Sequence, residues 1–150
     1  MPRLKSKQLS VSPPIVIGWR EYVRLPDLGI DEEFAAKMDT GAEYCTLHAT
    51  EIKPSRDFIS FRFESGKKLR AALIGKKDIT SSNGISTKRF VIRTRIKIGK
   101  KTIRSTVTLL DRSKMKTKML LGRKLLSNRF VINPRLSFVL SNGKKKAKTK

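Results

Sequence analysis

Apolar and polar residues alternate along most of this chain, which is the pattern of β-strands that bury one face. Ile59, Phe61 and Phe63 alternate with polar or charged neighbours, and an apolar-rich run returns from 69 to 74. Between them lies a turn-forming Ser-Gly-Lys-Lys stretch at residues 65–68. The pattern therefore predicts a β-hairpin over residues 58–74 with its tip at this stretch.

A second hairpin is predicted from the same alternation in residues 90–98 and 103–109, on either side of a turn that begins at Gly99. A helical stripe is almost absent, and only residues 124–127 predict a short helix. Many short strands separated by turn signals predict an all-β fold, a closed or partly closed β-barrel. Further strands are predicted at residues 19–25, 34–38, 130–133 and 136–140.

Charge is distributed unevenly along the chain. Residues 1–64 hold ten of the twelve acids against nine Lys and Arg, a net charge of −1, whereas residues 65–150 hold 26 Lys and Arg against two acids, a net charge of +24. Such a field attracts polyanions, whether acidic peptide, RNA or a membrane surface, and does not distinguish among them. Composition also predicts a flexible basic N-terminal segment at 1–14, one folded domain at 15–141 and a disordered lysine-rich tail at 142–150.

Compartment and redox state are inferred from what the sequence lacks. No apolar run approaches the length of a membrane span, and Pro13 and Pro14 stand where a signal peptide would need apolar residues. We therefore expect a cytoplasmic protein with no membrane partner. The single cysteine, Cys45, excludes an internal disulfide, and we expect it to be a small buried thiol.

Two short motifs carry the candidate chemistry. Asp39-Thr40-Gly41-Ala42 follows a strand-like run, so a carboxylate stands where a strand breaks into a tight loop. Thr40 offers a hydroxyl to a partner loop, and Gly41 lets the backbone turn and donate an N–H to the carboxylate. Alone, this motif is equally compatible with an ordinary turn. Later in the chain Leu120-Leu121-Gly122-Arg123 directly precedes the predicted helix.

Together with Ile17-Gly18-Trp19-Arg20-Glu21, these motifs resemble the retropepsin-like aspartic peptidases, and more specifically the bacterial RimB-like family, which also carries the label ATP-dependent zinc protease. The resemblance covers about residues 15–140 and implies a retropepsin-like closed β-barrel with one short C-terminal helix. It also implies that Asp39, Thr40 and Gly41 form the catalytic motif. Some family members accompany a ribosomal-protein glutamate ligase, which implies an acidic, glutamylated or glutamate-rich substrate.

Aspartic peptidase chemistry needs two carboxylates, one ionised to take a proton from water and one protonated to polarise the scissile carbonyl. The chain holds a single Asp-Thr-Gly motif. A homodimer is therefore predicted, in which a two-fold axis brings Asp39 opposite its own copy.

The resemblance also assigns supporting residues. In retroviral relatives the first hairpin after the catalytic loop closes over substrate as a flap, which by position is the hairpin over 58–74; the loop at residues 80–84 competes for this role. In viral relatives an acid in this loop pairs with the late Arg, so Glu43 is expected to bridge to Arg123 or else to be solvated. The substrate contacts expected on this basis are Ala42, Gly66, Lys67, Lys68 and Arg70, with the strand cations Arg93 and Arg95 adding attraction. The structural support is expected from Glu43, Leu121, Gly122 and Arg123.

Zinc and nucleotide chemistry have weak support in the sequence. His48 is the only histidine, and neither His-Glu-x-x-His nor a phosphate-binding P-loop occurs. A site from His48, Cys45 and a carboxylate stays open, but we expect His48 to be a hydrogen-bonded structural residue. We predict no metal and no cofactor.

Three hypotheses follow. The first is a homodimeric aspartic endopeptidase that activates water between two Asp39 carboxylates, acting on acidic peptide tails. The second is a catalytically silent basic β-barrel that binds acidic protein tails, RNA or the ribosome. The third is a zinc enzyme, as the family label has it.

Overall fold

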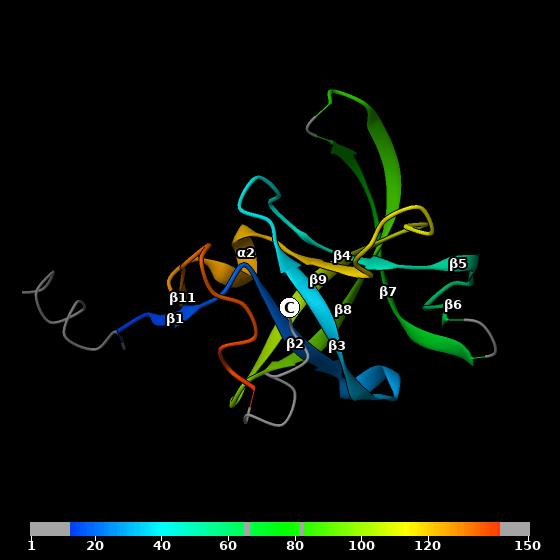
Figure 1. The fold of residues 1–150 in the computed structure, drawn as a ribbon. Coiled ribbons are helices and arrows are strands. Elements are labelled where there is room, and N and C mark those ends of the chain that lie inside the picture. The colour runs from blue at the N-terminus through cyan, green and yellow to red at the C-terminus, as the bar shows by residue number, and fades with distance from the viewer. Residues whose placement is uncertain (1–12, 65–66, 82, 142–150) are drawn as a thin grey trace, which may run out of the picture.

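The computed structural model describes residues 13–64, 67–81 and 83–141. Most of the described chain is β-strand, as the alternation predicts, and Figure 1 shows the short helix α2 to one side of the strands. In chain order the elements are β1 (Ile15–Ile17), β2 (Arg20–Leu25), the 3-10 turn η1 (Pro26–Leu28), β3 (Ile30–Met38), β4 (Cys45–His48), β5 (Thr50–Pro54), β6 (Phe58–Glu64), β7 (Lys67–Thr80), β8 (Ser86–Ile98), β9 (Lys101–Leu110), β10 (Met119–Leu121), α2 (Arg123–Leu126) and β11 (Phe130–Ile132).

Within the described residues, six strands close a ring in the order β2-β3-β10-β4-β9-β8, because β2 pairs with both β3 and β8. From β8 the sheet continues outward through β7, β6 and β5, which lie on the right of Figure 1. Strands β1 and β11 pair in parallel as a separate small sheet, on the left of Figure 1. The predicted all-β class is confirmed.

The predicted hairpin over 58–74 is confirmed as β6 and the first part of β7, and it belongs to the main core. Phe61, Phe63 and Leu69 are at most 5% exposed and pack in one cluster with side chains of the ring. Burying a large apolar side chain stabilises the fold by about 1.5–3 kcal/mol. This hairpin is therefore held in place by its own core residues.

The second predicted hairpin is also confirmed, as β8 and β9. Gly99 takes the positive φ of 58° that the tight turn requires. Strands β7 and β8 are longer than predicted, so the loop after Thr80 closes a third hairpin between them. A register shift next to Gly75 bends β7 within this hairpin, and none of its described residues from 76 to 88 is buried.

The strand predicted at 136–140 is wrong. This segment has no strand partner, because the Val139 and Leu140 N–H groups both donate to the carboxylate of Glu21, each at 3.0 Å. Glu21 is fully buried and also accepts from Gly18 N–H at 2.7 Å. A Cβ on Gly18 would lie 2.4 Å from the Leu136 carbonyl oxygen. The Gly-Trp-Arg-Glu motif therefore anchors the C-terminal segment.

The helix predicted at residues 124–127 is confirmed as α2, one residue earlier, and the strand predicted at 130–133 is confirmed as β11.

The predicted basic tail and all but Pro13 and Pro14 of the predicted N-terminal segment lie outside the described residues. Among the helices of the described ranges, none is long and apolar enough to cross a membrane.

Candidate active site

The Asp39 loop begins where β3 ends, as the sequence predicts. Asp39 N–H donates to the Leu121 carbonyl at 2.9 Å, which ties the start of the loop to β10. Gly41 N–H donates to the Asp39 carboxylate at 3.0 Å, the contact predicted for this glycine. The Asp39 side chain is partly buried, whereas Thr40 and Gly41 are exposed. The loop therefore presents one oriented carboxylate at the surface of the chain.

The two sequence motifs form one unit. A Cβ on Gly122 would lie 2.4 Å from the Tyr44 carbonyl oxygen, so only glycine permits the loop to approach this closely. Arg123 N–H donates to the Ala42 carbonyl at 2.8 Å, and Leu121 is fully buried beneath the loop. The start of α2 thus holds the loop in place through its backbone.

Of the two alternatives for Glu43, the bridge to Arg123 does not form, and the half-exposed side chain is closer to the solvated one. Because the backbone of Arg123 is bonded to the loop, its guanidinium lies over the loop and donates to the Thr40 carbonyl at 3.1 Å. Glu43 instead pairs with Lys124 at 3.7 Å, and both of these side chains are about half exposed. An exposed pair of this kind contributes little stability. Arg123 supports the catalytic loop by a different contact from the one expected.

The first predicted flap does not lie beside Asp39 in this chain. Lys67 Nζ donates to the Gly29 carbonyl at 2.8 Å, just before the start of β3, whereas Asp39 follows the end of that nine-residue strand. At about 3.3 Å per residue, β3 separates the two by up to roughly 30 Å. Lys68 is next to Lys67, and Arg70 stacks on Phe58 of β6. Gly66 lies outside the described residues.

The β7–β8 hairpin, whose loop was the competing flap, lies on the side of the Asp39 loop. Lys77 Nζ lies 5.5 Å from the centre of the Tyr44 ring, and Arg89 Nη1 donates to Thr46 Oγ1 at 3.4 Å. Tyr44 and Thr46 both follow the Asp39 loop closely in the chain. Figure 1 shows this hairpin (green) rising on the same side as the loop (cyan).

The residues of the suggested zinc site do not fit a metal. Cys45 and His48 are three residues apart on β4, so their side chains point to opposite faces of the strand. Cys45 is fully buried beside Ser105, where burial raises the pKa of its thiol. No group of three His, Cys, Asp or Glu side chains suited to a metal occurs within the described ranges.

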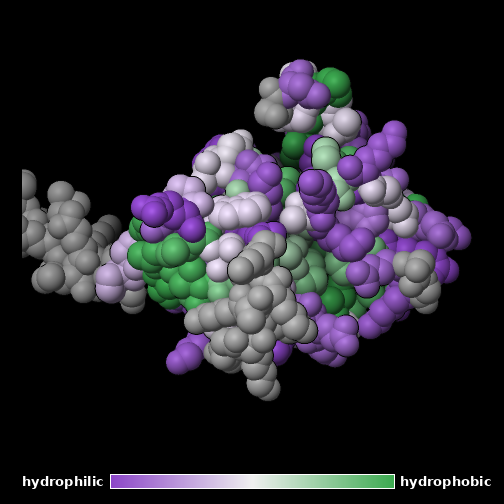
Figure 2. Space-filling model, in the orientation of Figure 1, coloured by the Kyte–Doolittle hydropathy of each residue, from purple (hydrophilic) through white to green (hydrophobic). Residues whose placement is uncertain are grey.

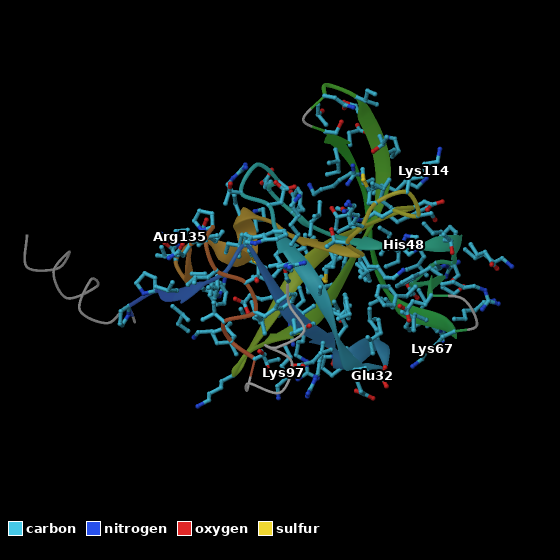
Figure 3. All side chains as sticks on the ribbon, in the orientation of Figure 1. Glu32, His48, Lys67, Lys97, Lys114 and Arg135 are labelled. Carbon is cyan, nitrogen blue, oxygen red and sulfur yellow. The ribbon has the colours of Figure 1, made fainter. Side chains whose placement is uncertain are left out.

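His48 is the structural residue that the sequence predicts. Its Nδ1 accepts the backbone N–H of Arg112 at 2.8 Å, which requires an unprotonated Nδ1. Burial, together with the nearby Lys118, lowers the pKa of His48, and the ring is therefore neutral near pH 7. Figure 3 shows His48 near the centre of the molecule and Lys67 at its lower right.

Sequence reasoning missed two arginines near the catalytic loop. Arg112 follows β9 and is 9% exposed, and Arg89 of β8 is partly buried. Burial lowers the pKa of both guanidinium groups, and that of Arg112 is lowered further by Arg89 and raised by Asp39. Arg89 is bonded to Thr46 and the Arg112 backbone to His48, two residues on the same face of β4, so both arginines lie on this face just after the Asp39 loop. No pattern in the sequence marks them, because the contact joins segments far apart in the chain.

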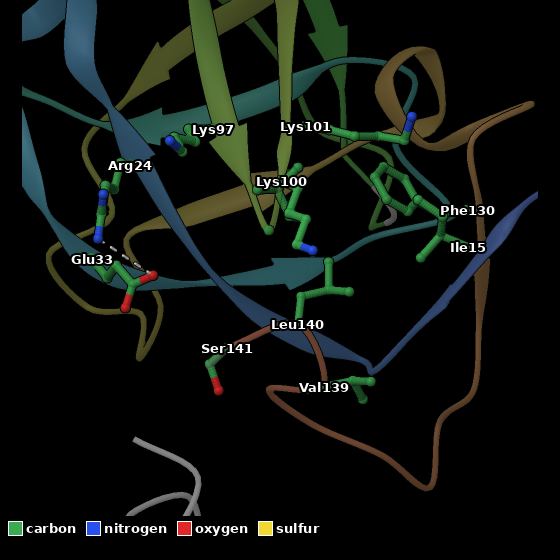
Figure 4. Close-up of a pocket in the computed structure, with 12 residues that line it drawn as sticks. Ile15, Arg24, Glu33, Lys97, Lys100, Lys101, Phe130, Val139, Leu140 and Ser141 are labelled. Atoms are coloured by element: carbon green, nitrogen blue, oxygen red, sulfur yellow. Dashed lines mark ion pairs between the residues drawn. The ribbon is translucent and has the colours of Figure 1, made fainter. Parts of the chain in front are cut away.

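A cavity of about 690 Å³ lies elsewhere, next to the β8–β9 turn. Figure 4 shows Lys97, Lys100 and Lys101 around it, with Leu140 among the apolar side chains of its wall. It includes no residue of the Asp39 loop. This cavity is therefore separate from the candidate active site.

A family model described as "RimB-like: Retropepsin-like aspartic endopeptidase RimB" matches residues 16–142. The chain belongs to the RimB-like family. This confirms the resemblance carried by the Asp-Thr-Gly-Ala and Leu-Leu-Gly-Arg motifs.

Relatives and solved structures give further similarity. Proteins named "Probable alpha-L-glutamate ligase" from Shewanella pealeana and Desulfotalea psychrophila are each 32% identical, over 83% and 88% of this chain. The chain spans about a third of these curated relatives, 30% and 31% of their length. A crystal structure of a Legionella pneumophila protein with unknown function matches at a TM-score of 0.71 and 26% identity, covering 86% of this chain and 100% of that one.

Proposed function

We propose that the protein is a homodimeric aspartic endopeptidase that cleaves acidic, glutamate-rich peptide segments. The observation that carries this proposal is the Asp39 loop, in which a partly buried carboxylate accepts the Gly41 N–H while Leu121 and Arg123 fix the backbone on both sides. A rigidly positioned carboxylate at the surface suits a reaction that depends on orientation. Membership of a family described as retropepsin-like aspartic endopeptidase supports the same chemistry.

The mechanism requires two copies of Asp39. The ionised carboxylate takes a proton from water as the water oxygen attacks the scissile carbonyl, and the protonated carboxyl donates to the carbonyl oxygen. The resulting diol collapses, with a proton passing to the leaving amine. Each chain has one Asp-Thr-Gly motif, so the second carboxyl has to come from a second chain. The exposed Thr40 and Gly41 would face that chain.

An exposed apolar surface supports dimerisation. Val16 of β1 and Val131 of β11 are cross-strand neighbours and are 49% and 51% exposed. Trp19 and Leu136, joined by a backbone hydrogen bond, are also exposed. Figure 2 shows apolar side chains gathered on the left of the molecule, over β1 and β11. Surfaces of this kind mark sites of protein association.

The acidic substrate is supported by charge and by relatives. Lys76, Lys77 and Arg89 project from the β7–β8 hairpin, and Arg112 lies near Asp39. Positive charge around a cleft raises the encounter rate with anionic peptides. The relatives named as glutamate ligases contain a segment similar to this chain, which fits a substrate rich in glutamate.

The test is Asp39→Asn in the full chain. The amide is nearly isosteric with the carboxyl but cannot exchange the shared proton, so hydrolysis of a glutamate-rich peptide should be lost while circular dichroism and the melting temperature are kept. Wild-type activity should survive a chelator and fall on dilution, and mixed dimers with one Asp39→Asn chain should be inactive. Unchanged cleavage by the Asp39→Asn protein would refute the peptidase. Binding of acidic peptide or RNA without cleavage by the wild type would favour the silent binding protein.

A further inference from the structure

Arg89 is partly buried and Arg112 is 9% exposed, so the partners of their guanidinium groups affect the stability of their charges. Arg89 Nε donates to Thr87 Oγ1 at 3.0 Å, and its Nη1 donates to Thr46 Oγ1 at 3.4 Å. Arg112 Nε donates to the Thr117 carbonyl at 2.9 Å. Every partner of these two guanidinium groups is a neutral oxygen. The hydrogen bonds orient the groups but bring no carboxylate into contact with either, and Asp39 acts on Arg112 only from a distance.

No acidic side chain of the chain forms an ion pair with either of these two arginines. All Asp and Glu residues of the sequence fall within the described ranges, and none lies within 4.0 Å of either guanidinium. Arg95, in contrast, is paired with Asp27 through contacts of 2.6 and 3.1 Å. Holding two like charges together with little exposure is unfavourable unless an anion joins them. The pair is therefore suited to a negative group from outside the chain.

The position of the pair relates it to the catalytic loop. Thr46, the partner of Arg89, is the second residue of β4, which begins just after the loop. The Thr46 hydroxyl also contacts the Thr108 hydroxyl at 3.1 Å, on the face of β4 and β9 opposite to the core residues Leu47 and Leu109. A ligand anion here would lie between the β7–β8 hairpin and the body of the domain, close to Asp39.

We propose that Arg89 and Arg112 form a carboxylate-binding subsite that selects an acidic side chain of the substrate next to the cleaved bond. This inference rests on the proposed function for its substrate, but carboxylate binding itself requires no hydrolysis. Guanidinium groups bind carboxylates in a forked, planar geometry, and the Thr46 hydroxyl orients Arg89 by accepting its Nη1–H. Because Arg89 comes from the hairpin and Arg112 from the body, one bound carboxylate also ties the hairpin to the body.

The experiment measures binding in the Asp39→Asn protein, so that cleavage does not interfere. A short polyglutamate peptide and its polyglutamine counterpart are titrated by calorimetry at low salt. Polyglutamate should bind at least about tenfold more tightly than polyglutamine, and Arg89→Gln and Arg112→Gln should each remove about tenfold of that preference. Lys53→Gln, an equal change of charge on the exposed strand β5, should leave the preference unchanged.

Further variants separate specificity from stability. Arg112→Lys keeps the charge but not the fork and should show an intermediate preference, which covers the case in which Arg112→Gln does not fold. Arg89→Glu should shift the preference of the protein toward a lysine-containing peptide. In otherwise wild-type protein, Arg89→Gln should raise KM for acidic peptides more than it lowers kcat.

Two results would overturn the subsite. One is polyglutamate binding by Arg89→Gln and Arg112→Gln equal to that of Lys53→Gln. The other is loss of dimer with unchanged peptide binding, which would assign the arginines to the dimer interface. Failure of the proposed function would look different, because the Asp39→Asn chain would then still hydrolyse peptide while these binding differences could stand.

Discussion

Two hairpins share strand β7 and differ in almost every physical property. The β6–β7 hairpin contributes Phe61, Phe63 and Leu69 to the core, and its Lys67 is bonded to Gly29. The β7–β8 hairpin beyond Gly75 has no buried residue in its described part up to residue 88. A segment that carries the core cannot move without unfolding part of the domain, whereas a polar segment outside the core can close over a ligand. The difference assigns stability to one hairpin and leaves the other free to act as the flap of the proposed peptidase.

The largest expected effect is on the buried hairpin. Phe61→Ala should lower the free energy of unfolding by about 3–5 kcal/mol, because it removes a fully buried aromatic side chain and leaves a cavity. Ile85→Ala, in the exposed part of the other hairpin, should change it by less than about 0.5 kcal/mol. Urea unfolding of the two variants makes the comparison. Equal destabilisation would mean that both hairpins belong to the core.

Shortening the exposed hairpin should affect activity without affecting stability. Thr80 and Ser86 are cross-strand partners, so residues 81–85 can be replaced by an Asn-Gly turn that keeps the register. We expect kcat/KM on a glutamate-rich peptide to fall by about tenfold or more, since the tip no longer excludes water from the substrate. The melting temperature should stay within about 2 °C. Full activity in this variant would remove the flap role from the β7–β8 hairpin.

Acid should lower the free energy of unfolding, because His48 is buried and its pKa is lowered. Burial lowers the pKa of His48, so as pH falls the unfolded chain takes up a proton before the folded chain does. The stability contribution is therefore complete above the ordinary histidine value of about 6.5 and is lost progressively as pH falls below it. Protonation of Nδ1 would also break the contact with Arg112 N–H.

The check is the melting temperature of wild type and His48→Asn between pH 7.5 and 5.5. The decline toward acid should be smaller in His48→Asn, because the amide does not titrate while its oxygen can still accept a hydrogen bond. Parallel declines in the two proteins would show that other groups are responsible.

The smallest expected effect concerns Lys77 of the β7–β8 hairpin and Lys67 of the β6–β7 hairpin. Lys77→Gln should lower kcat/KM for an acidic peptide by about two- to fivefold at low salt, because Lys77 lies beside Tyr44 at the catalytic loop. Lys67→Gln should have no effect, since Lys67 lies at the far end of β3. The difference should disappear at high salt. A larger effect of Lys67→Gln than of Lys77→Gln would indicate that the β6–β7 hairpin is the flap.

The Asp39 site was predicted from the sequence to the extent that it depends on local chemistry. Gly41 donates to Asp39 two residues away, which the Asp-Thr-Gly order alone implies. The partner of Arg123 was not predictable, because it depends on how the backbone of α2 meets the loop. Arg89 and Arg112 could not be predicted for the same reason, since both are far from Asp39 in the sequence.

The sequence by itself determined the strand class, two of the hairpins, the local geometry of the Asp-Thr-Gly motif and the family, because alternation and tight turns are properties of neighbouring residues. The tertiary structure decided which hairpin lies beside Asp39, and it converted the predicted strand at 136–140 into an irregular segment held by Glu21. It also decided which cations form ion pairs, as Arg95 does with Asp27, and which, like Arg89 and Arg112, bond only to neutral oxygens. Those outcomes depend on contacts between segments far apart in the chain, and their energies appear only when the ring of strands closes.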